Sequence, residues 1–140
     1  MLTKNGRLFH IDFGHFLGNV KRKFGIKRER TPFILTSDFV NVMEGGEGTS
    51  NFATFLEIAT KAFLIVRRHS PLLLNLLSLM VDANLSELRS ETDLDYIRGA
   101  LFLDRSEVDA IDAFRELIAD CLRSEWATHV NWYLHNLKHR

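Results

Sequence analysis

From residue 51 onward, the chain places apolar residues at the three- and four-residue spacing of a buried helix face, which limits what it can fold into. The first such stripe has six members: Phe52, Phe55, Leu56, Ala59, Phe63 and Val66. Arg67 and Arg68 follow it, and cations complement the C-terminus of a helix. This pattern predicts a long helix packed on a helical core, and hence a mainly α fold.

Further helix starts are marked by capping residues. A short helix is predicted from Ser37 through Met43, and Ser70-Pro71 opens a helix that is apolar nearly all round and is therefore expected at the centre of the core. Ser90 with Asp93 resembles a capping box. Other starts are predicted at Ser106 and Thr128, which gives about six helices in all. Their expected core comprises Phe55, Phe63, residues 72–79, Phe114 and Ile118.

The N-terminal part has a different pattern. Asn5-Gly6 is a favoured hairpin turn, and the alternating residues 7–12 after it predict a strand of a short β-hairpin. Residues 15–32 have no sustained period and are predicted to be a mobile loop. The domain therefore divides into a strand and turn (1–14), a loop (15–32) and a helical part (33–140), and the abrupt start suggests part of a larger domain.

The formal net charge is zero, but residues 15–30 carry six cationic side chains against one Glu, and the remaining residues are acidic overall. The cations form two basic boxes, Lys21-Arg22-Lys23 and Lys27-Arg28-Glu29-Arg30. Arg supplies a planar fork for phosphate and Lys a point charge, so the mixture suits a partner with several phosphates. A nuclear-localisation run, a nucleic-acid patch and a solvated loop are alternatives, and the acidic remainder disfavours nucleic acid.

Asp12-Phe13-Gly14 ends the predicted strand directly before this cationic loop. A carboxylate there suits Mg²⁺ that bridges to nucleotide phosphates, whereas a turn Asp without function is the alternative. His15 follows, and an imidazole beside a metal and phosphates can accept a proton or stabilise charge. A lone His on a loop is otherwise solvated surface, so the role of His15 depends on that of Asp12.

Further features of the sequence bear on the location of the protein. In the helix predicted from Thr128, Trp132 lies off the apolar stripe, which suits either an anchor at a membrane or domain interface or a ring packed under the domain edge. The single Cys121 excludes an internal disulfide and is compatible with a reducing compartment. The longest apolar run is too short to span a bilayer, and we expect no signal peptide at the start of the chain.

These residues carry a resemblance to a known family. The stretch LFHIDFGHFLGNVKRKFGIKRERTPFILTSDFV resembles the activation segment of class I phosphoinositide 3-kinases. YIRGALFLD, RSEVDAIDAF and SEWATHVNWYLHNLKHR resemble the late helices of the same family, so the likeness covers the whole chain. The chain is thereby similar to the C-terminal part of the kinase domain, from just before the DFG motif to the C-terminus, within a protein-kinase-like large lobe.

The resemblance implies roles for particular residues. Asp12 matches the Mg²⁺-binding acid, and His15 matches a His implicated in phosphoryl transfer. The nucleotide side includes Phe9, Ile11 and Asp12, whereas the headgroup of the lipid is read by Lys21, Arg22, Lys23, Lys27, Arg28 and Arg30. The membrane-contacting and regulatory region includes Trp126, Trp132 and Tyr133.

The activity implied is transfer of the ATP γ-phosphate to the 3-hydroxyl of phosphatidylinositol 4,5-bisphosphate or related phosphoinositides. The expected partners are ATP, the lipid at a membrane surface and a regulatory subunit, with no nucleic acid, in a cytoplasmic protein recruited to the plasma membrane. Thr31 stands where the family usually has Val. The family's ATP-anchoring Lys and catalytic loop lie upstream of the matched stretch, so the chain alone is expected to be inactive; a non-catalytic lipid-binding or interaction module is the alternative.

Overall fold

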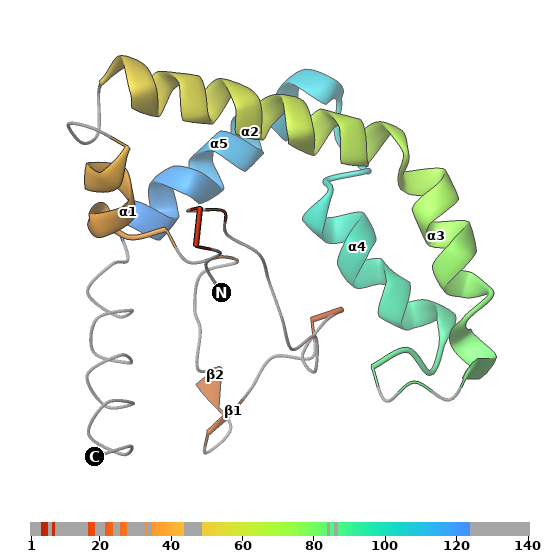
Figure 1. Cartoon of the computed structure of the whole chain (residues 1–140). Helices are drawn as coiled ribbons and strands as arrows, with labels where there is room; N and C mark the ends of the chain where they lie inside the picture. The colour runs from red at the N-terminus through yellow and green to blue at the C-terminus, as the bar shows by residue number, and fades with distance from the viewer. Residues whose placement is uncertain are drawn as a thin grey trace.

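Two long helices, α2 (Ser50–Arg68) and α5 (Glu107–Arg123), pack against each other and form the main body of the structure (Figure 1). This computed structural model describes residues 4, 5, 7, 17, 18, 22, 23, 26, 27, 33, 35–43, 49–83, 85 and 87–123. The rings of Phe63 on α2 and Phe114 on α5 stack with centroids 4.5 Å apart. The stripe predicted on α2 is thus confirmed as its packing face near Phe63, which is buried, whereas its predicted last member, Val66, is 46% exposed and that part of the prediction is wrong.

The core at the other end of α5 is closed by the segment before α2. The short helix α1 (Ser37–Val42) contributes Val40 to this cluster, together with Leu35, Phe52, Ile118 and Cys121. The Cys121 sulfur lies 3.2 Å from the carbonyl oxygen of Phe33, which ties the chain before α1 to α5. Thr36, rather than Ser37, is the N-cap of α1, because it has the extended backbone that a cap residue requires.

Helix α2 begins one residue before the predicted position. The N-cap is Thr49, whose Oγ1 accepts a hydrogen bond from the Phe52 backbone N–H at 3.3 Å. At its C-terminal end, Arg67 donates from Nε to the carbonyl oxygen of Leu101 and from Nη2 to that of Phe102, each at 3.2 Å. Arg67 therefore joins the end of α2 to the turn that leads into α5. This is a role in addition to the predicted one of complementing the C-terminus of its own helix.

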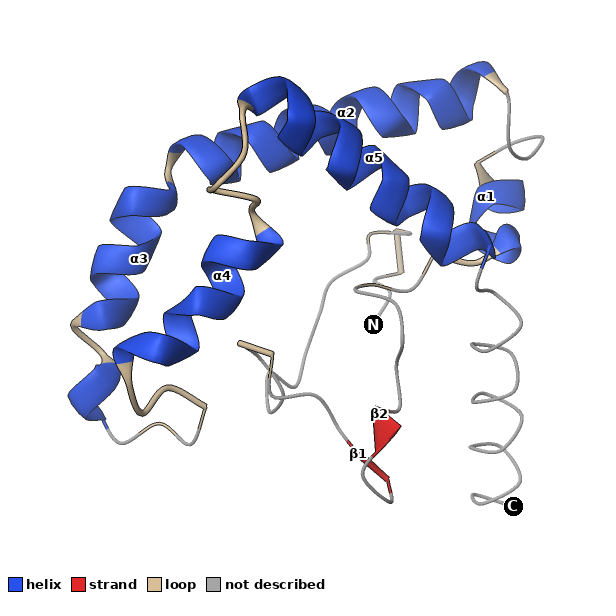
Figure 2. Ribbon diagram, turned by 180° about the vertical axis from the view of Figure 1, so that it is seen from behind, coloured by secondary structure: helices blue, strands red, loops and turns tan. Residues whose placement is uncertain are grey.

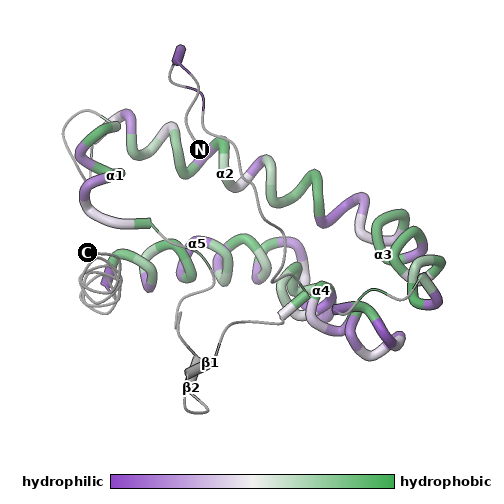
Figure 3. The backbone as a smooth tube through the Cα atoms, turned by 60° about the horizontal axis from the view of Figure 1, so that its bottom comes forward, coloured by the Kyte–Doolittle hydropathy of each residue, from purple (hydrophilic) through white to green (hydrophobic). Residues whose placement is uncertain are grey.

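The expectation that the helix opened by Ser70-Pro71 lies at the centre of the core is wrong. Helix α3 (Ser70–Ser78) buries only Ser70, whereas Leu72 is 60% and Leu76 53% exposed. The helix extends beyond the α2–α5 body and contacts the end of α2 and the segment before α4 (Figures 2 and 3). Its N-cap is His69, with Ser70 as the first helical residue.

The segment after α3 is compact and locally hydrogen-bonded. It comprises the 3₁₀ turns η1 (Val81–Ala83) and η2 (Glu91–Leu94), followed by helix α4 (Asp95–Ala100). The predicted capping box is confirmed, since the Ser90 N–H donates to Asp93 Oδ2 at 3.0 Å, and it opens η2. In the same segment, Leu88 and Leu94 are almost fully buried.

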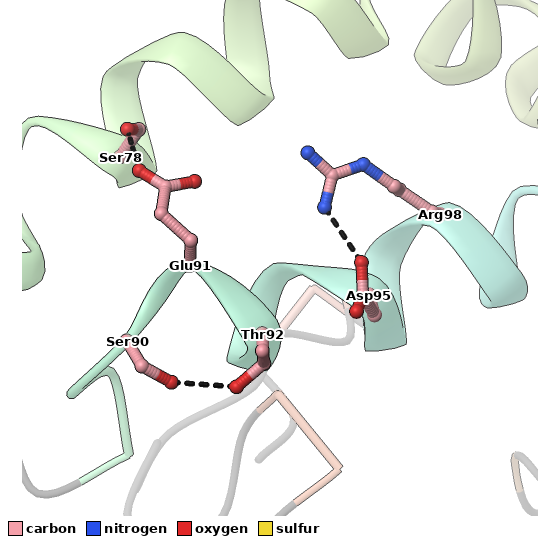
Figure 4. A network of polar contacts seen from close by, with 6 residues as sticks. All are labelled: Ser78, Ser90, Glu91, Thr92, Asp95 and Arg98. Carbon is pink, nitrogen blue, oxygen red and sulfur yellow. Dashed lines mark hydrogen bonds and ion pairs between the residues drawn. The ribbon is translucent and has the colours of Figure 1, made fainter.

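Short polar contacts fix η2 between α3 and α4 (Figure 4). The Ser78 hydroxyl donates to the Glu91 carboxylate, which connects the end of α3 to η2. Ser90 and Thr92 hydroxyls lie 2.7 Å apart, and Arg98 pairs with Asp95 at 2.7 Å on the exposed side of α4.

The two strands in the described part of the chain are very short. β1 (Arg22–Lys23) pairs antiparallel with β2 (Ile26–Lys27), within the loop that was predicted to lack regular structure. Of the strand predicted at 7–12, only Arg7 is described, and it is not assigned to a strand; residues 8–12 and the helix predicted from Thr128 lie outside the described residues. The prediction of a mainly α fold is confirmed, with five α-helices and two 3₁₀ turns in the described ranges. Among those helices, none has the length and hydropathy needed to cross a bilayer.

Candidate functional site: the basic loop and its contact with the helical body

Most of the predicted site residues fall outside the described ranges. They are Phe9, Ile11, Asp12 and His15 on the nucleotide side, Lys21, Arg28 and Arg30 in the boxes, and Trp126, Trp132 and Tyr133 near the C-terminus. Their roles therefore stay predictions. The described residues contain no cluster of three metal-ligating side chains, and the predicted Mg²⁺ ligand Asp12 lies outside them.

The remaining box residues lie in the β1–β2 ribbon. Arg22 is the register partner of Lys27, and Lys23 is the partner of Ile26. The pairing brings one residue of the first basic box level with one of the second, although the two lie five positions apart in the sequence. The ribbon stands apart from the helices (Figures 1 and 2). Backbone pairing therefore joins the two boxes into one cationic unit, which the sequence did not predict.

Leu17 and Gly18 precede the first box and turn the chain through the left-handed region. Their φ angles are +53° and +78°. The ring of Tyr96, on α4, lies directly against Gly18: a Cβ built at Gly18 would come 2.6 Å from the Tyr96 Cδ2 atom. This stretch lies beside α4 in Figures 1 and 2. The basic loop is thus in contact with the helical body just before the first box.

The position of Tyr96 is fixed from both ends of its helix. At the N-terminal end, the Arg89 and Ser90 N–H groups donate to the Asp93 carboxylate, at 2.8 and 3.0 Å. At the C-terminal end, Arg67 binds the carbonyl groups that follow α4. These hydrogen bonds hold η2 and the turn after α4, which are the two segments that flank the helix carrying Tyr96.

Hydrogen bonding also sets the charge state at the start of this unit. The backbone N–H of Arg89, and after it that of Ser90, hold the pKa of Asp93 below its ordinary value, because both stabilise the ionised carboxylate. Asp93 therefore carries a negative charge at neutral pH and keeps η2 capped.

Tyr96 was missed by reasoning from the sequence. The glycine at 18 was recognised only as a sign of a loop, because its partner lies 78 positions further along the chain. Nothing local marks Tyr96, which is half exposed on a six-residue helix. A long-range contact of this kind becomes visible only in three dimensions.

Comparison with known proteins identifies the family of the chain. The profile of the family described as phosphatidylinositol 3- and 4-kinase matches residues 1–90, which is more than half of the chain. The chain belongs to this family. Its matched residues include the predicted Asp12 turn, the β1–β2 ribbon and helices α1 to α3.

Two relatives from Dictyostelium discoideum match nearly the entire chain. Phosphatidylinositol 3-kinase 1 is 45% identical over 139 residues, which cover 99% of this chain. Phosphatidylinositol 3-kinase 3 is 43% identical over all 140 residues. The chain spans only 9% and 8% of the lengths of these two relatives. The similarity thus concerns one segment of much larger kinases.

Proposed function

We propose that this chain forms the activation segment and C-terminal helices of a class I phosphoinositide 3-kinase. The activity of the parent enzyme is transfer of the ATP γ-phosphate to the 3-hydroxyl of phosphatidylinositol 4,5-bisphosphate or a related phosphoinositide, in phosphoinositide signalling. Family membership supports the chemistry, because the two relatives carry the name phosphatidylinositol 3-kinase. The basic ribbon supports the choice of a multiply phosphorylated headgroup.

The β1–β2 register is the observation that carries the substrate assignment. Arg22 and Lys27, one from each box, are paired at the same level of a ribbon that stands apart from the helices. Like charges directly opposite each other on a ribbon are mutually repulsive, so such an arrangement is favoured by an anion that contacts both. A headgroup with two phosphates has this charge, whereas unphosphorylated phosphatidylinositol has only its single diester phosphate.

The remaining roles follow the sequence predictions. Asp12 would hold Mg²⁺ beside the ATP phosphates, where a divalent cation would supply charge neutralisation. His15 handles a proton or stabilises charge at the transferring group. The boxes orient the headgroup so that its hydroxyl lies in line with the γ-phosphate. The proposed protein is cytoplasmic and is recruited to the plasma membrane. Its Trp126, Trp132 and Tyr133 lie near the lipid surface, and a regulatory subunit binds elsewhere.

The test uses a chimaera in which this chain replaces the matching 139-residue segment of Phosphatidylinositol 3-kinase 1. Lys21, Lys23, Lys27 and Arg28 are neutralised together, and turnover of the bisphosphorylated lipid is compared with that of phosphatidylinositol. A matched control neutralises four exposed cations on the helices: Lys61, Arg68, Arg98 and Arg123. We expect a loss of preference for the bisphosphorylated lipid in the first variant alone. An unchanged preference would refute the headgroup role.

The metal role of Asp12 has a separate test in the same chimaera. Asp12→Asn keeps the size of the side chain and removes the charge that binds Mg²⁺, so turnover should vanish while the far-ultraviolet circular dichroism spectrum is unchanged. Retained turnover with either lipid would show that Asp12 is not the metal ligand.

The alternative function is a non-catalytic lipid-binding module. Sedimentation of the 140-residue chain with vesicles distinguishes the two: binding to vesicles that contain the bisphosphorylated lipid, together with an inactive chimaera, favours the module. An active chimaera favours the kinase segment, whether or not the chain alone binds vesicles.

A further inference from the structure

The contact between Gly18 and Tyr96 leaves no room for a side chain at position 18. A Cβ at Gly18 would lie 2.6, 3.1 and 3.2 Å from the Tyr96 Cδ2, Cγ and Cε2 atoms. The φ angle of +78° at the same position is also one that residues with a Cβ rarely adopt. Two independent constraints, one steric and one conformational, therefore converge on glycine at this point.

By contrast, Gly99 on the same helix as Tyr96 is under no such constraint. A Cβ there would meet nothing within 4 Å. Because alanine is a better helix former than glycine, its introduction at position 99 should be neutral or slightly stabilising. The chain thus contains a matched pair of glycines: Gly18, which lies against the Tyr96 ring, and Gly99, which lies three residues after Tyr96 in open space.

The contact lies close to the first basic box along the chain. Arg22, the first residue of β1, is four residues after Gly18. Four residues span at most about 14 Å when fully extended. A restraint at Gly18 therefore limits the positions that β1, and through its pairing β2, can reach.

We propose that Tyr96 is a positioning residue for the basic loop: its ring, held on α4, supports the left-handed turn at Leu17 and Gly18 and thereby sets where the cationic ribbon meets the substrate. The proposal rests on the proposed function for its substrate, and on the Gly18–Tyr96 contact for its geometry. Tyr96 does not touch the headgroup. It determines headgroup preference through the loop.

The geometry is tested first, without reference to activity. In the nuclear magnetic resonance spectrum of the 140-residue chain, nuclear Overhauser effects should connect the Gly18 α-protons with the Tyr96 ring protons. The ring current should also displace the Gly18 α-proton shifts. Both signals should persist in Tyr96→Phe, and the displaced shifts should return toward ordinary values in Tyr96→Leu. Absence of the cross-peaks in a folded chain would overturn the proposal.

The consequence for specificity is tested in the chimaeric kinase. Gly18→Ala and Tyr96→Ala should each raise KM for the bisphosphorylated lipid about tenfold, a change of about 1.4 kcal/mol. The kcat on phosphatidylinositol should change little. Tyr96→Phe and Gly99→Ala should behave as the parent. In the Gly18→Ala/Tyr96→Ala double variant, KM for the bisphosphorylated lipid should rise by less than the product of the two single increases. Removal of the Tyr96 ring removes its overlap with the new Cβ at position 18.

The outcomes separate the two proposals. A chimaera that is inactive on both lipids contradicts the proposed function, while the cross-peaks still decide the contact. If the chimaera is active and prefers the bisphosphorylated lipid, but Gly18→Ala, Tyr96→Ala and the milder Tyr96→Leu leave that preference unchanged, Tyr96 has no positioning role. Equal losses on both lipids in these variants would indicate general destabilisation and would also overturn it.

Discussion

Helices α2 and α3 follow one another almost without a break, and both are rich in apolar residues, yet only one is built into the core. Along α2, Phe52, Thr60 and Phe63 are buried, whereas the only buried residue of α3 is Ser70. Leu72 and Leu76 in α3, and Leu79 directly after it, are each at least half exposed.

The difference lies in the arrangement of the apolar residues. In α2 they recur on one face, and an opposing helix, α5, covers that face. In α3 they surround the helix, so the pattern does not specify which side is to be covered. Periodicity predicts a burial direction, whereas overall hydrophobicity predicts only that burial would be favourable.

The largest effect should come from the α2–α5 seam. Phe63→Ala removes a ring that is 7% exposed and stacks on Phe114 at 4.5 Å. We expect the free energy of unfolding of the chain to fall by about 3–5 kcal/mol, as measured by urea denaturation. Ile65→Ala, on the exposed side of the same helix, is the control and should change it by less than about 0.5 kcal/mol. Equal effects would mean that the seam is not the core.

The next effect should come from Arg67, which extends the role of α2 to the turn before α5. Arg67→Ala leaves the carbonyl groups of Leu101 and Phe102 without their charged donor. We expect a loss of about 1–3 kcal/mol in the free energy of unfolding. Arg67→Lys should recover only part of it, because an ammonium group lacks the fork that reaches several acceptors. The neighbouring Arg68→Ala, exposed on the same helix, is the comparison.

The helices and their caps also show how far the sequence predicts the fold. The α2 stripe as far as Phe63 and the Ser90–Asp93 capping box were predicted correctly, because each depends on residues within a few positions of one another. Helix starts at α1 and α3 were displaced by one residue, since adjacent Thr36 and His69 take the cap positions. Local chemistry thus located the elements well, though not their first residue.

Relations that depend on tertiary packing or on the path of the backbone were not predictable in the same way. The exposure of α3 depends on which elements pack against it, and the pairing of Arg22 with Lys27 and the contact of Gly18 with Tyr96 depend on backbone paths. For the candidate site, the sequence identified the basic boxes, and the structure shows how two of their residues pair. The roles of Asp12 and His15 came from motif and resemblance, and they stay predictions.

Acid pH should lower the free energy of unfolding by a smaller amount, through the capping box that opens η2 between α3 and α4. Because hydrogen bonds from Arg89 and then Ser90 lower the pKa of Asp93 in the folded chain, its ionised form contributes stability above the unfolded pKa of about 4. That contribution is lost as the pH falls through the lower, folded pKa. A carboxyl titration followed by nuclear magnetic resonance should give a lower pKa in the folded chain than in urea.

Asp93→Asn separates this carboxylate from the others in the chain. The variant should be less stable than the parent at pH 6, and the difference should shrink as the pH falls through the folded pKa of Asp93 and the parent carboxyl becomes protonated. If the difference in stability between Asp93→Asn and the parent does not depend on pH, Asp93 acts through its shape and its hydrogen bonds, and not through its charge.

The smallest effect should come from α3, where the contrast with α2 is most easily broken. Leu76 is 53% exposed, so Leu76→Ser should change the free energy of unfolding of the chain by no more than about 0.5 kcal/mol, despite the loss of a large apolar side chain. Ile65→Ser on α2, with 57% exposure, is the matched control because its environment is equally open. A loss above about 2 kcal/mol at Leu76 alone would be the cost of a core truncation. Such a loss would mean that α3 is covered in solution, and that all-round apolarity had specified burial after all.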